Sequence, residues 1–379
     1  MRAPQARARR DTVELADIVR RHGASFRATH RLCAVQHRAL NAIEHCRTAA
    51  LGGELYQCDA CSAQRYVYHS CRNRHCPKCQ TRAKERWLAA RRAELLPVPY
   101  YHLVFTLPHE LNALAQGRPR EIYTMLFAAA SETLVEFGRN PRWLGGEIAA
   151  TVVLHTWGQT LSQHLHLHCL IAAGALSEAG AWLRSRRGFL FPVKALSIVF
   201  RAKFLAALVK LTVQAPLPAA LRAKPWVVYA KRPFAGPEQV LEYLGRYTHR
   251  TAISNERLVS LEAESVRFRY KDYAHGNRRK VMQLEAVEFL RRFALHVVPR
   301  GFNRIRHYGL LANRSKRALL AQARAALDAP APVLVATASE SVAAFWQRIA
   351  GLDIERCPHC HRGSLRVVAT LAPHTHPPP

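Results

Sequence analysis

Three histidines alternate with leucine in the segment 163–171, and this run constrains the fold more than any other part of the chain. Alternation with a period of two is typical of a β-strand, and it directs His164, His166 and His168 to one face. Imidazole is the most common metal ligand in proteins, so a strand that presents stacked histidines on one side is expected to bind an ion. The segment therefore predicts a metal-binding strand within a sheet.

The spacing of these histidines limits how many of them can share an ion. His164 and His168 lie about 13 Å apart along an extended strand, whereas a metal–nitrogen bond is about 2.1 Å long. We therefore expect two of the three histidines to hold an ion, and the remaining one to be an ordinary polar residue. A third ligand should come from a neighbouring element, for which His155 and Gln159 are the candidates.

Two tyrosines follow on a segment that predicts a helix. Residues 236–238, Gly-Pro-Glu, are a typical helix start. Tyr243 and Tyr247 are four residues apart and share one helix face with Arg246 and Arg250. The pKa of tyrosine is near 10, so its hydroxyl needs a metal ion or a cation nearby to attack a phosphate. The alternative is that both tyrosines are core aromatics of an amphipathic helix.

The charge of the chain points to a polyanionic partner. Its 379 residues include 56 Lys and Arg against 26 Asp and Glu, a formal net charge of +30. A GC-rich genome would favour arginine codons, but it would not explain the shortage of acidic residues. Electrostatic attraction to phosphates dominates non-specific nucleic-acid binding, so we expect a nucleic-acid-binding protein.

Two Cys-x-x-Cys knuckles near the N-terminus predict a structural zinc site. Their inner cysteines are 15 residues apart, and two facing knuckles supply four thiolates in a closed tetrahedron. This set comprises Cys58, Cys61, Cys76 and Cys79. A second zinc site, or an exchange of ligands with the first, could involve His45, Cys46, Cys71 and His75. The alternative for the second set is a small buried thiol and polar surface histidines.

Basic residues surround these knuckles, Arg74 and Lys78 among them. They suggest that the zinc-binding region grips DNA, although a solvated charged face would have the same composition. A third knuckle, Cys357-x-x-Cys360, has no second cysteine pair beside it. Histidines close to it in sequence could complete a site, and these are His359, His361, His374 and His376.

The chain carries no signal for a membrane or for secretion. It lacks an apolar run of the roughly 18 residues that a transmembrane helix needs, and its basic first ten residues precede no apolar segment. We therefore expect a cytoplasmic protein with no membrane partner. In a reducing compartment its ten cysteines predict metal sites in place of disulfides.

The order of the expected elements predicts an α+β fold. Strands near residues 102–107, 151–157, 164–173 and 226–231 are separated by helices at 120–137 and 194–213, with no glycine-rich nucleotide loop between them. A further hairpin is expected from residues 266–271 and 279–284. This pattern favours a mainly antiparallel central sheet flanked by helices, preceded by a helical and zinc-ribbon domain.

Several motifs, taken together and in order over roughly residues 40–310, resemble the two-tyrosine rolling-circle transposases of the bacterial IS-ninety-one group. They are SCRNRHCPKCQ, YYHLVFTLPHE, HTWGQTLSQHLHLHCLIAAG, EYLGRYTHR and FRYKDY. The resemblance implies a basic tail at 1–10, a zinc-binding domain at 11–95, an HUH (His-hydrophobic-His) nuclease domain at 100–312 and a basic extension at 313–379. It also implies cleavage and joining of single-stranded DNA at transposon ends and in target DNA.

The resemblance also assigns roles within the motifs. It selects His166 and His168 as the ligands of a catalytic divalent ion, Mg²⁺ or Mn²⁺, because the family's pair directly precedes the apolar end of its strand. It implies that Tyr243 and Tyr247 are the nucleophiles that form a 5′-phosphotyrosine. Arg246 and Arg250 are then expected to contact DNA.

Other mechanisms fit the sequence less well. A transposase that uses three carboxylates on two metal ions needs at least two aspartates in its core, and Asp272 is the only aspartate between residues 91 and 327. A non-catalytic zinc-ribbon protein that binds nucleic acid would leave the histidine strand and the tyrosine pair unexplained. A replication initiator or conjugative relaxase would share the chemistry and differ in the DNA that it serves.

Overall fold

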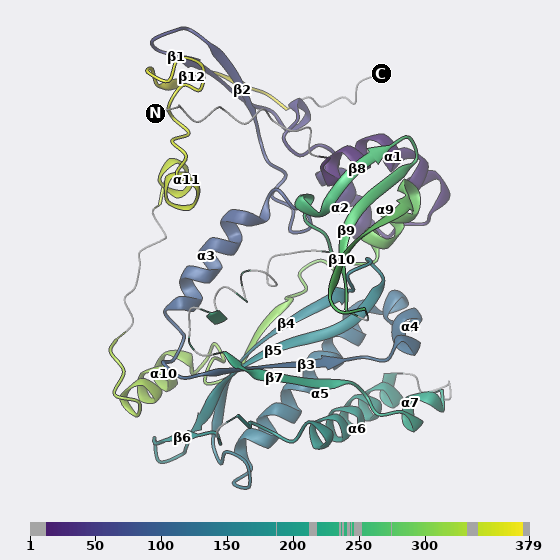
Figure 1. Ribbon diagram of the computed structural model, residues 1–379, viewed down its shortest axis with the longest axis vertical. Helices are drawn as coiled ribbons and strands as arrows, with labels where there is room; N and C mark the ends of the chain where they lie inside the picture. The colour runs from purple at the N-terminus through teal and green to yellow at the C-terminus, as the bar shows by residue number, and fades with distance from the viewer. Residues whose placement is uncertain are drawn as a thin grey trace. The chain divides into compact units, whose positions relative to one another are not determined.

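The computed structural model describes residues 13–186, 188–211, 218–234, 236, 239–240, 243, 245, 252–273, 275–331 and 340–373. The chain forms two compact units, and each is built from segments that are far apart in sequence (Figure 1). The first unit comprises Met1–Arg86, Ile253–Arg291 and Leu334–Pro379, and the second comprises Trp87–Ala252 and Arg292–Val333. The expected α+β class with antiparallel sheets is confirmed.

The second unit is built on a six-stranded antiparallel sheet. The strands run in the order β11 (Ile305–Gly309), β4 (Glu147–Trp157), β5 (Gln163–Leu176), β3 (Tyr100–Thr106) and β7 (Val228–Phe234), and β6 (Trp182–Arg184) pairs with β5. The central strand β5 and its neighbour β4 are buried along most of their length. The histidine segment therefore lies in the middle of the sheet.

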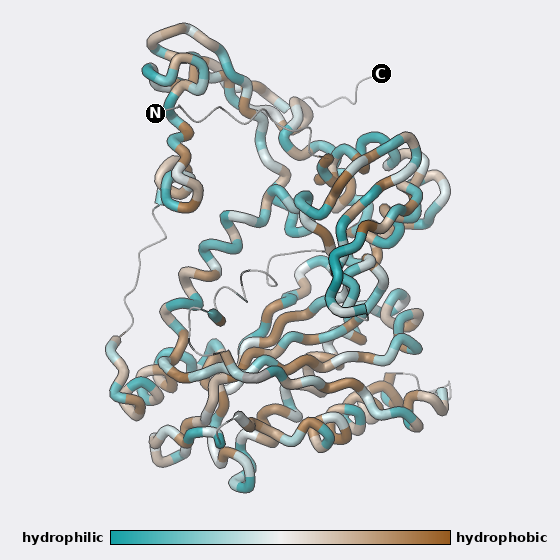
Figure 2. Tube along the Cα trace, in the orientation of Figure 1, coloured by the Kyte–Doolittle hydropathy of each residue, from teal (hydrophilic) through white to brown (hydrophobic). Residues whose placement is uncertain are grey.

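Two long helices cover one face of this sheet, α5 (Pro119–Arg139) and α6 (Val193–Leu211), with the shorter α4 (Asn112–Gly117) and α7 (Ala220–Ala223) nearby (Figure 1). Apolar residues concentrate in these strands and helices (Figure 2). Leu165 and Leu167 of β5 belong to this core together with Phe200 of α6. Because side chains alternate along a strand, the intervening His166 points to the opposite face of the sheet.

A second apolar cluster covers part of that opposite face. It contains Leu170 of β5, Leu320 of α10 (Lys316–Ala325) and Val240. Leu88 of α3 (Gln80–Arg92) packs against it, and a Cβ on Gly245 would lie 3.0 Å from the Leu88 side chain. The described residues of the expected tyrosine helix are therefore anchored on the face that carries the histidines.

The first unit contains a helix pair and a three-stranded sheet. The helices are α1 (Leu15–Thr29) and α2 (Ala34–Glu44), and the sheet runs β10 (Arg278–Glu285), β9 (Ser265–Asp272) and β8 (Leu258–Glu262), followed by α9 (Ala286–Ala294). The Leu15 amide donates to Asn255 Oδ1 at 3.2 Å, so segments remote in sequence join here. The expected hairpin is confirmed, with Gly276 and Asn277 supplying positive φ at its turn.

A second small sheet in this unit joins β12 (Leu365–Leu371), β1 (Gly53–Cys58) and β2 (Gln64–Tyr68). Strands β1 and β12 pair antiparallel, from Gly53 opposite Leu371 to Cys58 opposite Leu365. The segment after residue 334 thus belongs to the first unit, which also includes residues 253–291. This arrangement cuts across the linear division expected from the sequence. None of the described helices is both long and apolar enough to cross a membrane.

Candidate functional site

The histidines of the central sheet form a compact group. His166 and His168 lie on β5, and His155 on β4 is directly opposite His166 in the strand register. The candidate ligand atoms of the three residues all lie within 4.8 Å of one another. His166 Nε2 and His168 Nε2 are 3.1 Å apart. His155 was one of the two candidates from the sequence for a third metal ligand; the other was Gln159.

These distances fit a divalent ion. Two nitrogens bound at right angles to an ion at about 2.1 Å lie about 3.0 Å apart, close to the separation of the two Nε2 atoms. Burial, with a smaller effect from His164, lowers the pKa of His166 to about 3, and burial is also the main cause that holds the pKa of His168 well below its usual value. Neutral imidazole is the form that binds a metal ion.

His164 stands outside this group and orients one of its members. Its side chain is exposed, whereas its carbonyl oxygen lies 2.9 Å from His166 Nδ1. A proton on Nδ1 would donate to that carbonyl and leave Nε2 free as a ligand atom, as is usual for histidines that bind metal. The expectation that only two of the three β5 histidines converge agrees with this geometry.

Tyr243 contacts the histidine group. It lies on the face of the sheet that the second apolar cluster covers. Its phenol oxygen lies 2.6 Å from His102 Nε2 and 3.0 Å from His168 Nδ1. His102 Nε2 and His168 Nδ1 are themselves 2.8 Å apart. All three side chains are largely buried. Tyr247, Arg246 and Arg250 lie outside the described residues.

His102 is a site residue that the sequence interpretation missed. It lies on β3, where Val104 pairs with His168, and because residues two apart share a face, His102 faces the same side as His168. Burial, followed by the charges of Lys231 and His166, lowers the pKa of His102 to about 3. A neutral His102 can accept the phenol proton at Nε2, while His168 can donate from Nδ1 to the phenol oxygen.

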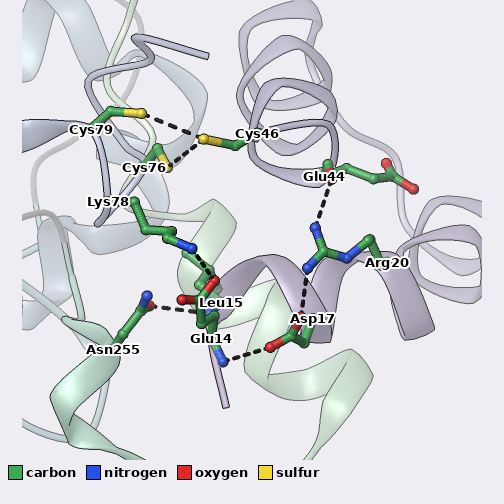
Figure 3. Close-up of polar contacts among 10 residues, drawn as sticks. All are labelled: Glu14, Leu15, Asp17, Arg20, Glu44, Cys46, Cys76, Lys78, Cys79 and Asn255. Carbon is green, nitrogen blue, oxygen red and sulfur yellow. Dashed lines mark hydrogen bonds and ion pairs between the residues drawn. The ribbon is translucent and has the colours of Figure 1, made fainter. Parts of the chain in front are cut away.

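In the first unit, one four-cysteine cluster has the geometry of a zinc site. It comprises Cys46, Cys71, Cys76 and Cys79. The Cys46–Cys79, Cys71–Cys79 and Cys46–Cys76 sulfur distances are 3.5, 3.6 and 3.7 Å, and Figure 3 shows three of the four residues. Four sulfurs at about 2.3 Å from a tetrahedral zinc ion lie about 3.8 Å from one another, so these thiols fit Zn²⁺.

The predicted combination of Cys58, Cys61, Cys76 and Cys79 in one site is wrong. Cys58 and Cys61 group with Cys357 and Cys360 instead. The reason is the β1–β2 hairpin between the knuckles: Cys58 ends β1 and Cys61 lies in the turn, whereas Cys71 and Cys76 follow β2. A six-residue strand extends about 20 Å, which places the two knuckles at opposite ends of the hairpin.

The other predicted residues of this region have different surroundings. His45 Nδ1 lies 2.9 Å from the Asn41 carbonyl oxygen, and His75 Nδ1 lies 3.1 Å from Asn73 Oδ1, so neither belongs to a cysteine group. The Lys78 ammonium forms an ion pair with Glu14 at 2.7 Å (Figure 3). Arg74 is half-buried, and burial lowers its pKa.

Known transposases are similar to this chain over most of its length. A family described as "Transposase zinc-binding domain" matches residues 18–107, and a family described as "Putative transposase" matches residues 149–318. The chain is 46% identical to "Putative transposase y4qJ" of Sinorhizobium fredii, over 96% of this chain and 97% of that protein. It is 29% identical to the "Transposase for insertion sequence element IS801" of Pseudomonas savastanoi pv. phaseolicola, over 71% of this chain and 68% of that protein.

A solved structure, "Conjugative Relaxase TrwC in complex with mutant OriT Dna", is 14% identical, with 59% of this chain and 72% of that chain covered at a TM-score of 0.26. At that score the likeness carries no argument. The sequence relatives, the first of which spans nearly the whole chain, confirm the resemblance that the motifs indicated. The chain belongs to the IS-ninety-one-group family of transposases, with their N-terminal zinc-binding domain.

Proposed function

We propose that this transposase cuts and rejoins single-stranded DNA through a 5′-phosphotyrosine, with His155, His166 and His168 holding a divalent ion. The observation that carries the proposal is the 3.0 Å contact between the Tyr243 phenol oxygen and His168, a member of the histidine group. It brings a candidate nucleophile and candidate metal ligands together on one face of the sheet. A divalent ion on these imidazoles would withdraw charge from the oxygens of a bound phosphodiester.

A residue beside the phenol can accept its proton. In the proposed step the Tyr243 oxygen attacks phosphorus, the proton passes to His102 Nε2, and the bond from phosphorus to the 3′-oxygen breaks. The 3′-oxygen takes up a proton, from the protonated His102 directly or through solvent, and leaves as a 3′-hydroxyl, which is able to prime replication. No water acts as nucleophile, so rejoining is the reverse of the same step and conserves the phosphodiester energy.

Tyr243 contacts His168 at Nδ1, and this contact favours a second role, in which Tyr243 holds His168 in position. Its phenol oxygen lies at Nδ1, whereas Nε2 faces His166 and the proposed ion. Partners at the second nitrogen of a ligating histidine fix its tautomer and orientation. Tyr243 could therefore position His168 while Tyr247 attacks first, and the two tyrosines then exchange roles at the second cut.

The donor set of the site bears on the choice of metal ion. Among the described residues the group holds three imidazoles and no carboxylate. Mg²⁺ prefers oxygen ligands, and nitrogen ligands bind Mn²⁺ and later transition metals better. Of the two ions named from the sequence, we propose that Mn²⁺ supports cleavage at lower concentration than Mg²⁺. Equal activation by both ions at every concentration would contradict this choice.

The DNA-binding roles of Arg74, Lys78, Arg246 and Arg250 are part of the proposal. Their support is the net charge of +30 and the electrostatic origin of phosphate affinity. Lys78 would have to share its charge between DNA and Glu14, so its contribution to affinity should be smaller than that of an unpaired lysine.

A covalent trapping experiment tests the proposed function. The protein is incubated with single-stranded oligonucleotides from the ends of its own transposon and with Mn²⁺, and adducts are separated on a denaturing gel. We expect a covalent adduct that a Tyr243→Phe/Tyr247→Phe double variant cannot form. A protein that only binds nucleic acid would shift the oligonucleotide on a native gel and form no adduct at all. An adduct formed by the double variant would place the nucleophile elsewhere.

A further inference from the structure

The C-terminal knuckle has a partner that lies far away in the sequence. Cys58 Sγ is 3.7 Å from Cys360 Sγ, and Cys61 Sγ is 3.8 Å from Cys357 Sγ. The two cysteines of these pairs are 302 and 296 residues apart in the sequence, respectively. His359, a candidate ligand from the sequence, has Nδ1 4.0 Å from Cys61 Sγ and is not a member of the four-cysteine group.

The distances between these sulfurs fit one zinc ion. Sulfurs around a tetrahedral zinc ion are about 3.8 Å apart, whereas a disulfide bond is about 2.05 Å long. The four ligand atoms all lie within 4.8 Å of one another. Cys58 and Cys357 are buried, and Cys61 and Cys360 are half-buried. Four thiolates fill all the positions of a tetrahedral zinc ion, so the site leaves no place for a substrate.

The backbone around the sulfurs is arranged as in a metal-binding knuckle. The Ala60 amide lies 3.4 Å from Cys58 Sγ, and the Gly363 amide lies 3.4 Å from Cys360 Sγ. Amides that point at sulfur stabilise the thiolate form, which is the form that binds zinc. The other cysteine cluster has the same feature, since the Asn73 amide lies 3.5 Å from Cys71 Sγ.

The two knuckles are also joined by hydrogen bonds between their loops. The Asp59 amide donates to the Ser364 carbonyl oxygen at 3.1 Å, and the Ser364 amide donates to Asp59 Oδ1 at 2.8 Å. Directly beyond them, β1 and β12 pair from Cys58 opposite Leu365 onwards. A Cβ on Gly363 would lie 2.5 Å from Cys58 Sγ, so only glycine allows the loops to come this close.

We propose that the protein binds a second structural zinc ion, held jointly by Cys58 and Cys61 from one end of the chain and by Cys357 and Cys360 from the other. The ion completes a zinc ribbon whose two halves are separated by the whole transposase domain. The C-terminal segment 357–371 is therefore a structural part of the N-terminal zinc-binding domain. It does not form an independent extension.

Zinc content measured by elemental analysis tests this assignment. Results are expressed as zinc lost relative to wild type, which removes any ion on the histidines from the comparison. Cys58→Ser/Cys61→Ser and Cys357→Ser/Cys360→Ser should each lose one equivalent, and the quadruple variant should also lose one, because both pairs hold the same ion. Combining Cys58→Ser/Cys61→Ser with Cys76→Ser/Cys79→Ser should lose two. Cys33→Ser, which replaces an exposed thiol, is the control and should lose none.

Two results in this series would overturn the proposal. One is an unchanged zinc content in Cys357→Ser/Cys360→Ser, and the other is a loss of two equivalents in the quadruple variant. A loss of only one equivalent in the combined Cys58, Cys61, Cys76 and Cys79 variant would restore the pairing inferred from sequence spacing.

Thiol alkylation of the wild-type protein gives an answer that does not depend on variant folding. N-ethylmaleimide should modify Cys33 at once and leave the half-buried Cys61 and Cys360 unmodified while zinc is bound. After chelation, Cys61 and Cys360 should become reactive together, as read by peptide mass spectrometry. Alkylation of Cys360 at the rate of Cys33 in the zinc-loaded protein would contradict the proposal. So would thiols that react only after a reductant is added, since that result indicates disulfides.

Discussion

The phenol oxygen of Tyr243 lies 2.6 Å from Nε2 of His102, a buried histidine on the strand next to the histidine strand. Because burial holds the pKa of His102 near 3, its ring is neutral at physiological pH and Nε2 has a free lone pair. Such a weak base takes the phenol proton only as the phenol oxygen bonds to phosphorus, which makes that proton far more acidic. We predict that His102→Gln lowers the rate of oligonucleotide cleavage by about 10²- to 10⁴-fold, the usual contribution of a general base.

The pH profile separates this role from a purely structural one. Without an internal base, cleavage by the His102→Gln variant should accelerate with rising pH as the phenol ionises in solution, and the deficit should shrink. His109→Gln, which replaces an exposed histidine near the same strand, is the matched control and should cleave at the wild-type rate. A deficit that is constant from pH 6 to pH 10 would assign His102 to packing.

The two tyrosines are predicted to act in turn. Tyr243→Phe and Tyr247→Phe each keep the ring and remove only the hydroxyl, so each should fold normally and strongly reduce transposition in cells. On the helix expected from the sequence, one turn of about 5.4 Å would separate the two residues, which would let each approach the same phosphate. Adduct yield on single oligonucleotides measures the first cut separately from transposition.

A different pattern would assign Tyr243 to positioning. If Tyr243→Phe still forms the adduct but needs about 10- to 100-fold more Mn²⁺, it acts through His168, as partners of ligating histidines do. Tyr247 would then be the first nucleophile. If only one of the two variants loses transposition, the mechanism uses a single tyrosine.

Replacement of the clustered histidines should separate cleavage from binding. His166→Ala and His155→Ala remove candidate ligand atoms and should abolish cleavage. Binding of the oligonucleotide, followed by fluorescence anisotropy, should change little because it depends on the arginines. His164→Ala, at an exposed position outside the group, should retain most of the activity. Full cleavage by the His155→Ala variant would remove that residue from the metal site.

The second unit should lose stability in mild acid through His296. Burial is the largest cause that lowers the pKa of this histidine to about 4, against about 6.5 in the unfolded chain. As the pH falls, His296 takes up a proton in the unfolded state at a higher pH than in the folded state. Its contribution to the free energy of unfolding is therefore fully present above pH 6.5 and is lost as the pH falls to 4, by at most about 3 kcal/mol.

Urea unfolding followed by tryptophan fluorescence measures this effect, because Trp157 packs 6.1 Å from the His296 ring. His296→Gln has no group that titrates in this range and should show a flatter dependence on pH, although the loss of bonds to Thr156 and Leu161 should lower its stability at neutral pH. An identical pH dependence in the two proteins would exclude His296 as a source.

Gly363 is predicted to control how well the C-terminal knuckle retains zinc. A methyl group there would collide with Cys58 Sγ and with the Ala60 Cβ at 2.5 and 2.6 Å, so Gly363→Ala should speed zinc release to a colorimetric chelator. Gly117→Ala, where a Cβ would meet nothing within 4 Å, is the control. Equal release rates would show that the loops can separate without losing the ion.

The sequence predicted the histidine strand well because its signal is local. Alternation along 163–171 identifies β5 and the face that His166 and His168 share, and no distant residue is needed for either conclusion. His155 required the register between β4 and β5, which depends on a turn closed by a bond from the Gly158 amide to the Ser162 carbonyl oxygen. Counting back from a turn centred on residues 158–162 would place His155 opposite Leu165. A register shift between His155 and Trp157 brings it opposite His166 instead, and the sequence does not mark that shift.

The errors arose where partners are remote in sequence. His102 reaches the group through the pairing of β3 with β5, and alternation alone does not reveal which strands are neighbours. The knuckles were paired by proximity in sequence, but the hairpin between them points Cys58 away from Cys76. Nothing local indicates that residues beyond 350 complete a sheet that starts at Gly53.

The pairing of β1 with β12 also determines when during synthesis this sheet can form. The ribosome synthesises Cys58 long before Cys360, which lies 302 residues later. The sheet of β12, β1 and β2 therefore stays incomplete while the whole transposase domain is synthesised. Contacts of such long sequence separation close late. A ribosome that stops early, or an element truncated at its 3′ end, therefore yields a chain in which β1 lacks its partner β12.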